Sequence, residues 1–406
     1  MRSELPELLG ETYASLAERA CAFAQRELAG LEEEPQDAAA EDALARQSLS
    51  KLAREGLLAY AVPAAETTQH PATATALVAG ANGGAASTPD VRSIAILRET
   101  LAYWSGMADL AFVMQGLGSF PIALAGSPEL KGRWLAAVAG GEAIAALAIT
   151  EPEAGSDLAS IRLEARKDGG DYLLDGVKTL ISNAPIADLV TVIARTGPGE
   201  GSKGLSGFAI PGRHAGLDRS ERLRLIAAHP IGVLRFSGCR VPASWRIGGE
   251  GDGARIALAT LSRFRPTVGA AAVGFASRAF DEARRRAKER VQFGRPLAEF
   301  GAIQCKLAEM ATLIDAARLL VYRAAAALDA GERGARESSM AKLFATEAAS
   351  QVADEAVQIF GGLGVVRGTA VERIYREVRA LRIYEGTSEI QRSIIAREIV
   401  EGPESE

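Results

Sequence analysis

The hydrophobic period of the sequence changes twice, and this change restricts the chain to a mixed architecture. Apolar residues recur at helical spacing near the start, as at Leu16, Ala20 and Phe23. Short β-type runs replace this pattern from residue 143, and the helical spacing returns after the glycine-rich stretch 248–253. The sequence therefore predicts an α+β fold, mostly α, with a helical segment 1–142, a β segment 143–247 and a helical segment 248–406.

The β segment contains turn chemistry and no helical spacing between its runs. Asp168-Gly169-Gly170 and Asp175-Gly176 tolerate positive φ, so each predicts a tight hairpin turn. Strands joined this closely favour an antiparallel sheet or barrel over a βαβ array. Residues 61–92, rich in Ala, Thr, Gly and Pro, predict a long surface loop before this segment.

The C-terminal segment predicts a helical bundle. Pro266 lies inside its first helix and is expected to kink one turn. Ser388 followed by Gln391 predicts a capping box at the start of the last helix. The Ala-rich faces either close a core of their own or leave a stripe for another subunit. The expected helices cover about 254–290, 299–330, 336–360, 370–380 and 388–401.

Composition excludes several classes of protein. With 406 residues the chain exceeds the length of about 250–300 at which single cores stop growing, so two or three packed units are expected. A net charge of −5 gives no reason to bind nucleic acid. Three distant cysteines and three histidines without ligand spacing predict neither a disulfide framework nor a metal site. An acidic N-terminus and no apolar run of about 18 residues predict a cytoplasmic protein without a signal peptide or membrane span.

Four short segments carry the chemistry. They are TEPEAGSD at 150–157, ERVQFGRPL at 289–297, QIFGGLG at 358–364 and YEGTSEIQR at 384–392. The glycine cluster of QIFGGLG does not match a dinucleotide fingerprint, because a helical pattern and not a strand precedes it. In this order and at these separations, the four segments resemble the acyl-CoA dehydrogenase family, medium-chain-type members most of all. Two further stretches, at 126–142 and 265–274, extend the resemblance over nearly the whole chain.

The resemblance implies an N-terminal helical domain, a middle antiparallel β domain and a C-terminal four-helix bundle. It implies FAD between the β domain and the bundle, reaching a neighbouring subunit of a homo-oligomer, in the family commonly a tetramer. The implied reaction, within fatty acid metabolism, converts an acyl thioester of CoA or of a carrier protein into the trans-2-enoyl product. Electrons then pass to an electron-transfer flavoprotein.

Glu385 is the residue that the resemblance assigns as the α-proton base, with flavin N5 as hydride acceptor. It occupies the position of the family's usual catalytic glutamate in YEGT. Some members carry the base on the long helix instead, but the matching residue here is Phe264, which accepts no proton. Without the other motifs, Glu385 would be interpreted as a carboxylate stabilising a helix N-terminus.

The same resemblance assigns the other site residues. Arg290 suits pyrophosphate because a guanidinium binds paired oxygens, although an ordinary solvated arginine is the alternative. Arg265 either shapes the surroundings of Glu385 or forms an ion pair within the bundle. Ser182 corresponds to a hydroxyl residue near flavin N5. The full cofactor set is Ile149, Thr150, Ser156, Ser182, Arg290, Phe293, Gln358, Gly361, Gly362, Thr387 and Glu389, and the substrate set is Ser156, Arg265, Tyr384, Glu385 and Gly386.

The chain also departs from the family pattern. Leu180 replaces a tryptophan that shields one flavin face, Ser182 replaces a threonine, and FSGC at 236–239 replaces an acidic stretch. These differences leave the substrate open. They also keep two alternatives: an oxidase in which oxygen reaches the reduced flavin, and a catalytically silent acyl-thioester binder.

Overall fold

The computed structural model describes residues 11–29, 34–63, 90–197 and 201–401. These residues form two compact units, and each is considered by itself. The first unit contains residues 1–34, 91–109 and 262–406, and the second contains 35–90 and 110–261. The chain passes between the units within helices α6 (Gly106–Ala125) and α8 (Gly253–Glu289). Residues 64–89 of the predicted surface loop lie outside the described residues.

A nine-stranded sheet forms the centre of the second unit, in the order β6-β8-β3-β2-β4-β5-β9, with β1 paired to β4 and β7 to β8. Most neighbours are antiparallel, as predicted. The pairing of β1 with β4, and one residue pair between β2 and β4, are parallel, so the sheet is mixed. The strands are β1 (Ala145–Ala148), β2 (Glu164–Asp168), β3 (Asp171–Ser182), β4 (Leu189–Arg195), β5 (Leu205–Pro211), β6 (Leu217–Asp218), β7 (Arg222–Leu223), β8 (Ile231–Pro242) and β9 (Arg246–Ile247).

Of the two hairpin turns predicted from glycine pairs, one is confirmed. Gly169 and Gly170 connect β2 to β3, whose residues pair from Asp168 with Asp171 onward. The turn predicted at Asp175-Gly176 is wrong, because β3 runs through it with only a register shift against β8. Gly176 is needed there since a Cβ would lie 3.0 Å from the Cα of Leu163.

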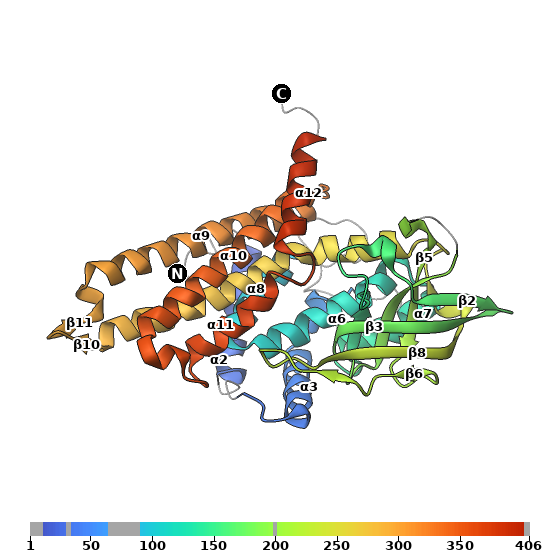
Figure 1. The fold of residues 1–406 in the computed structure, drawn as a ribbon, viewed down its shortest axis with the longest axis horizontal. Coiled ribbons are helices and arrows are strands. Elements are labelled where there is room, and N and C mark those ends of the chain that lie inside the picture. The colour runs from blue at the N-terminus through green and yellow to red at the C-terminus, as the bar shows by residue number, and fades with distance from the viewer. Residues whose placement is uncertain (1–10, 30–33, 64–89, 198–200, 402–406) are drawn as a thin grey trace. The chain divides into compact units, whose positions relative to one another are not determined.

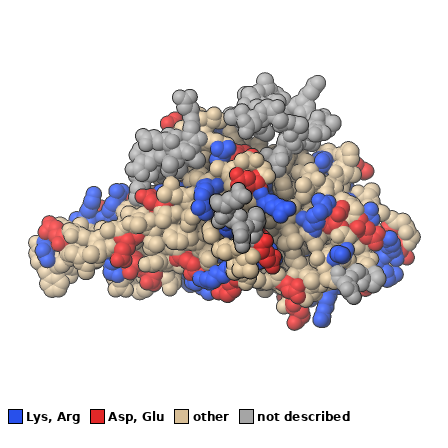
Figure 2. Space-filling view, turned by 90° about the horizontal axis from the view of Figure 1, so that it is seen from above, with Lys and Arg blue, Asp and Glu red and all other residues tan. Residues whose placement is uncertain are grey.

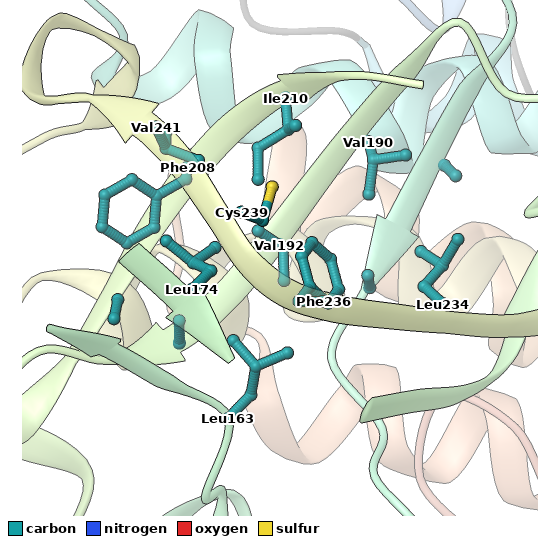
Figure 3. Close-up of a cluster of buried hydrophobic side chains, with 14 of the residues drawn as sticks. Leu163, Leu174, Val190, Val192, Phe208, Ile210, Leu234, Phe236, Cys239 and Val241 are labelled. Atoms are coloured by element: carbon teal, nitrogen blue, oxygen red, sulfur yellow. The ribbon is translucent and has the colours of Figure 1, made fainter. Parts of the chain in front are cut away.

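The sheet folds around an apolar core built from its inward-facing side chains. Figure 3 shows Leu174 of β3, Val192 of β4, Phe208 of β5 and Phe236 of β8 pointing into the same space. Each of these side chains is at most 3% exposed. Burial of a side chain of this size contributes roughly 1.5–3 kcal/mol. This core therefore fixes the positions of the strand ends.

Among the described residues, the second unit also contains α3 (Ala38–Arg54), most of α6, α7 (Pro128–Ala139) and the start of α8. Helix α6 is long and apolar enough to cross a membrane, but 83% of its apolar window is buried inside the protein. Its Gln115 side chain donates to the carbonyls of Val138 and Ala143 and accepts from the amide of Ala145. These contacts are those of a core helix in a folded unit.

The first unit is helical, as its sequence period predicts. Helices α9 and α10 pack against each other, and α11 and α12 pack on α10. Figure 1 shows the small hairpin of β10 (Val291–Gln292) and β11 (Arg295–Pro296) at the end of the bundle where α8 ends and α9 begins. The helices are α2 (Glu11–Glu27), α5 (Val91–Trp104), the later part of α8, α9 (Gly301–Asp329), α10 (Ala335–Phe360), α11 (Ala370–Leu381) and α12 (Ser388–Val400).

Helix α8 includes Pro266, and the kink there stays a prediction. The capping box predicted for the last helix is wrong. The cap of α12 is Thr387, whose side chain accepts from the amide of Ile390, so the capping box predicted at Ser388 does not form. Ser388 instead donates to the carboxylate of Glu347 on α10, a tertiary contact that local sequence rules do not include.

The described surface seen in Figure 2 intersperses basic and acidic side chains. Neither sign occupies a continuous field across that face. This mixture agrees with the small formal net charge of −5.

Candidate active site

Glu385 lies in the turn between α11 and α12, and its backbone has an unusual conformation. Its φ is +53° and that of Gly386 is +94°, so two successive residues are left-handed. This conformation costs a residue with a Cβ about 1–2 kcal/mol. The side chain of Gln391 holds the turn by donating to the carbonyl oxygens of Gly386 at 2.9 Å and Glu385 at 3.4 Å. Strain retained in this way is typical of functional positions.

Lys342 reaches the same turn from α10. Its Nζ donates to the carbonyl oxygen of Gly386 at 2.6 Å, and the side chain is fully buried. Burial lowers the pKa of Lys342 to about 8, while the negative charge of Glu385 opposes this shift. A buried cation therefore both fixes the turn and faces the carboxylate of Glu385.

The carboxylate of Glu385 is half-buried, and its Oε2 atom is enclosed without a hydrogen-bond partner in the described part of the chain. Burial raises its pKa, whereas the positive charges of Arg98, Lys342 and Arg265 lower it. Buried carboxylate oxygens are normally hydrogen-bonded. The free oxygen therefore indicates a carboxyl group prepared to accept a proton or a ligand.

Sequence reasoning missed a buried ion pair beside this carboxylate. Arg98 of α5 binds Asp109 of α6 through two hydrogen bonds of 2.8 Å, and it also donates to Thr267 at 3.2 Å. Arg98 is only 1% exposed. The available signal was Asp109 as the one charged residue of the apolar helix α6, since such charges are buried only when paired. Of the two charges, Arg98 lowers the pKa of Glu385 and Asp109 raises it.

Arg265 of α8 lies near Glu385, as the resemblance implies. It is only 7% exposed, and its Nε has no hydrogen-bond partner among the described residues. Within these residues it also makes no ion pair shorter than 4 Å, so the bundle ion pair considered above is not formed. Burial lowers its pKa, and Glu385 raises it. The neighbouring Phe264 is fully buried and supplies no second base.

In the second unit, the segment after β1 is fixed to β3 by a buried ion pair. The Nζ of Lys178 donates to the carbonyl of Ile149 at 2.7 Å and to Glu151 at 2.9 Å. Glu151 also accepts from the amides of Arg162 and Leu163. Sequence reasoning missed both charged residues, although Glu151 belongs to a quoted motif. The pair holds Ile149, and the residues that follow it, against the strand that ends at Ser182.

The end of β3 has irregular backbone on both sides of Ser182. Leu180 has a φ of +56° with its side chain 53% exposed, and Asn183 has a φ of +63°. The amide of Thr179 donates to the carbonyl of Thr150 at 2.9 Å, which brings two predicted cofactor segments together. Ser156 is exposed on the same segment as Thr150. Thus Thr150 lies beside β3 three residues before Ser182, whereas Ala145 lies beside Asn183.

A second group of predicted cofactor residues lies at the hairpin end of the bundle. Phe293, at the tip of the β10–β11 hairpin, is 94% exposed with a φ of +51°. At the end of α10, Gly361 and Gly362 have no atom within 4 Å of an added Cβ. Arg286 of α8 stacks over Phe360 at 5.8 Å, which places the end of α10 near that of α8. Arg290 and Gln358 are exposed here.

Thr387 and Glu389 do not join this group. They begin α12, where the adjacent Ser388 binds Glu347, so they lie near the first half of α10. Glu347 and Gln358 are separated by about 17 Å along that helix, at 1.5 Å per residue. The predicted pyrophosphate and adenosine residues therefore form two clusters within one chain.

The residues of these clusters have the chemistry needed to bind the phosphates and the planar rings of FAD. An open glycine pair lets a ligand approach the backbone closely, and an exposed arginine suits phosphate oxygens. The exposed ring of Phe293 and the exposed Val365, at 74%, supply apolar surface for a planar group. The described residues contain no group of three or more His, Cys, Asp or Glu side chains arranged to hold a metal ion.

Comparison with known proteins gives a consistent assignment. Family models match the N-terminal domain of acyl-CoA dehydrogenases at residues 10–142, the middle domain at 146–239 and the C-terminal domain at 251–400. The 3-(aryl)acrylate reductase of Clostridium sporogenes is 40% identical over 78% of this chain and 85% of its own. The cyclohexane-1-carbonyl-CoA dehydrogenase of Geobacter metallireducens is 40% identical over 74% and 80%.

Among solved structures, the FAD complex of PigA is 29% identical, with a TM-score of 0.82, and covers 97% of this chain and 98% of its own. These matches confirm the family, the fold class and the cofactor that the sequence predicts. The chain belongs to the acyl-CoA dehydrogenase family, and it is a flavoprotein oxidoreductase of the kind that uses FAD and acts on CH–CH groups.

Proposed function

We propose that this chain dehydrogenates an acyl-CoA thioester between its α and β carbons, with Glu385 as the base that removes the α-proton. The observation that carries the proposal is the enclosed Oε2 of Glu385, which has no partner in the described chain and belongs to a carboxyl group of raised pKa. A general base needs both a free lone pair and a pKa raised toward the working pH.

The charges around Glu385 adjust this basicity. Burial alone would favour the protonated form, which accepts no further proton. The cations of Arg98, Lys342 and Arg265 oppose the effect of burial and favour the ionised form. The net direction is a raised pKa, so the ionised carboxylate of Glu385 is a stronger base than a solvated carboxylate.

The backbone amide of Glu385 supports the second part of the reaction. It donates no hydrogen bond within the described chain, whereas the preceding amide of Tyr384 donates to the carbonyl of Ala380. A free donor next to the base suits the thioester oxygen, on which negative charge develops as the α-proton leaves. Tyr384, Gly386 and Arg265 would line the substrate position, and Ser156 is assigned to the substrate by the family resemblance.

FAD, when bound, supplies the acceptor for the hydride that leaves the β-carbon, at its N5 atom. Ile149, Thr150, Ser156 and Ser182 would hold its ring system. Arg290, Phe293, Gln358, Gly361 and Gly362 would hold pyrophosphate and adenosine, as would Thr387 and Glu389. Because these last two lie about 17 Å along α10 from Gln358, we assign the two clusters to FAD molecules of neighbouring subunits. This assignment requires a homo-oligomer, for which a tetramer is our expectation.

The proposed electron acceptor is an electron-transfer flavoprotein, and the expected compartment is the cytoplasm. One observation favours the oxidase alternative: Leu180 is 53% exposed at the position where the family has a shielding tryptophan. Mixing substrate-reduced enzyme with air-saturated buffer separates the two. Slow reoxidation rules out the oxidase, and fast reoxidation that slows in Leu180→Trp supports it.

The decisive experiment is a panel of acyl-CoA thioesters watched for flavin bleaching under nitrogen. The panel includes straight-chain, alicyclic and aryl-substituted acyl groups, since two relatives act on ring-bearing compounds according to their names. Glu385→Gln is expected to retain FAD and bind thioesters but to bleach at least about 100-fold more slowly. Glu398→Gln, on the outer part of α12, is the control. Normal bleaching in Glu385→Gln would contradict the assignment of the base.

A further inference from the structure

We propose that His229 is a positioning residue that holds the hydroxyl group of Ser182 toward the flavin. The proposal rests on the proposed function, in which Ser182 contacts the FAD ring system. Its basis is a hydrogen bond of 2.8 Å between the Nε2 atom of His229 and the Oγ atom of Ser182. No motif in the sequence connects these residues, which lie far apart in the chain.

The backbone on both sides of this contact is fixed. Ser182 is the last residue of β3 and pairs with Ile231 of β8. The amide of Asn183 donates to the carbonyl of Pro230 at 2.6 Å, and the side chain of Asn183 donates to the carbonyl of Ala145 at 3.1 Å. The residues that follow Ser182 and His229 are therefore bonded directly to each other.

A separate contact anchors His229 to the N-terminal helical region. Its backbone amide donates to Oε1 of Glu41, in the first turn of α3, at 2.7 Å. Arg222 of β7, the strand before this loop, forms ion pairs with Glu41 and Asp42 of α3. Pro230 further restricts the backbone of His229 to extended conformations. These contacts therefore fix the backbone of His229, from which its imidazole reaches Ser182.

The imidazole is neutral near pH 7, because burial lowers its pKa to about 4. A neutral imidazole has one nitrogen that donates and one that accepts. If Nε2 accepts, the Ser182 hydroxyl donates to it and keeps its oxygen lone pairs for a ligand donor. If Nε2 donates, the hydroxyl proton stays available for a ligand acceptor. Both tautomers fix the position of Oγ.

This positioning matters because serine has three staggered χ1 rotamers and little bulk to select one. A threonine, usual at this position in the family, is stiffer because its Cβ is branched. The hydrogen bond from His229 therefore supplies the restraint that the missing methyl group would otherwise provide. Removing it is expected to weaken FAD binding without unfolding the unit.

The test is a double-mutant cycle on the FAD affinity of the apoprotein, followed by quenching of flavin fluorescence. His229→Ala is expected to weaken FAD binding about 5-fold, the effect of one typical hydrogen bond. In the Ser182→Ala background the same change is expected to have less than about a 2-fold effect. His229→Gln, whose amide can also reach Ser182, is expected to restore most of the affinity. His214→Ala is the control, since His214 bonds the carbonyl of Arg240 on the surface.

Two outcomes overturn the proposal. One is an unchanged FAD affinity in His229→Ala. The other is the same loss in the presence and absence of the Ser182 hydroxyl, which would reveal a general structural role. Suppose that acyl-CoA bleaches the flavin of the wild-type protein, while the effects of the His229 and Ser182 changes on FAD affinity are additive. Only the role of His229 then fails. If it never bleaches with any thioester, the proposed function fails, whatever the cycle shows.

Discussion

The Nζ atom of Lys342 lies 2.6 Å from the carbonyl oxygen of Gly386, the residue that follows Glu385. A fully buried lysine on α10 is thus bonded to the backbone of the turn that carries the candidate base. The bond accounts for the otherwise unfavourable left-handed conformation of Glu385, because it holds the adjacent peptide in one orientation. It also brings a cation close to the carboxylate.

Lys342→Met is therefore expected to shift the pH dependence of the reaction. Removing a cation near Glu385 raises the pKa of its carboxyl further, since Lys342 is one of the charges that lowers it. A base acts only when ionised, so the acid limb of kcat/KM is expected to move to higher pH. Flavin bleaching measured from pH 5 to pH 9 gives the comparison. Lys306→Met, which breaks an ion pair with Glu355, is the control. An unchanged acid limb would contradict this coupling.

Glu385→Gln is expected to make the protein more stable at neutral pH. The pKa of Glu385 is higher in the folded state than in the unfolded state. The folded state therefore binds the proton more tightly, and its stability falls as pH rises from the unfolded pKa through the raised folded pKa. A glutamine side chain binds no proton in this range, so the variant does not lose stability in this way as pH rises. The difference in Tm between variant and wild type is expected near zero at pH 4 and positive at pH 8. A negative difference at pH 8 would show that the carboxylate stabilises the fold.

Lys178→Met tests the buried ion pair of the second unit. The change leaves Glu151 charged and without its cation at only 7% exposure, and it removes the donor to the Ile149 carbonyl. Breaking one half of a buried pair costs about 3–5 kcal/mol. Urea denaturation is expected to show this loss, together with weaker retention of FAD. Lys167→Met, which breaks an exposed pair with Glu250, is the matched control and is expected to change stability little. Equal losses of stability in Lys178→Met and Lys167→Met would show that burial does not decide the cost of breaking the ion pair.

Gly274→Ala is expected to destabilise the first unit strongly. An added Cβ at Gly274 of α8 would lie 2.2 Å from the carbonyl oxygen of Glu99 on α5, and backbone cannot move aside as a side chain can. Overpacking of this kind costs about 1–3 kcal/mol or more. Gly132→Ala is the opposite case, because nothing lies within 4 Å of its added Cβ in α7. There, the higher helix propensity of alanine is expected to add up to about 1 kcal/mol. A Gly274→Ala protein as stable as wild type would contradict this packing.

The helices and most strands were predictable from the sequence because the signal is local. Helix α8 was expected at about 254–290 and spans Gly253–Glu289. Errors arose where a tertiary contact overrides a local rule. Asp175-Gly176 is a turn signal in isolation, but pairing with β8 extends the strand through it. Ser388 is a suitable cap in isolation, but it bonds Glu347 instead.

The candidate site was predictable only in part. Motif resemblance identified Glu385 and Arg265, and the structure brings them together. It also named Arg290 and Thr387 for one cofactor, yet these lie in separate clusters of the chain. Resemblance assigns residues to a ligand without stating which subunit supplies them. The proposed assignment of the two clusters to FAD molecules of neighbouring subunits would account for their separation.

The sequence by itself determined the order of helices and strands, the family and the identity of the candidate base, because periodicity and short motifs are properties of neighbouring residues. Only the tertiary structure decided what surrounds that base. Arg98, Lys342 and Arg265 come from three different helices, and no pattern along the chain encodes their convergence on Glu385. The same holds for His229 and Ser182. Contacts between residues distant in sequence are set by the packing of whole elements, so the electrostatics of the site appear only after the chain has folded.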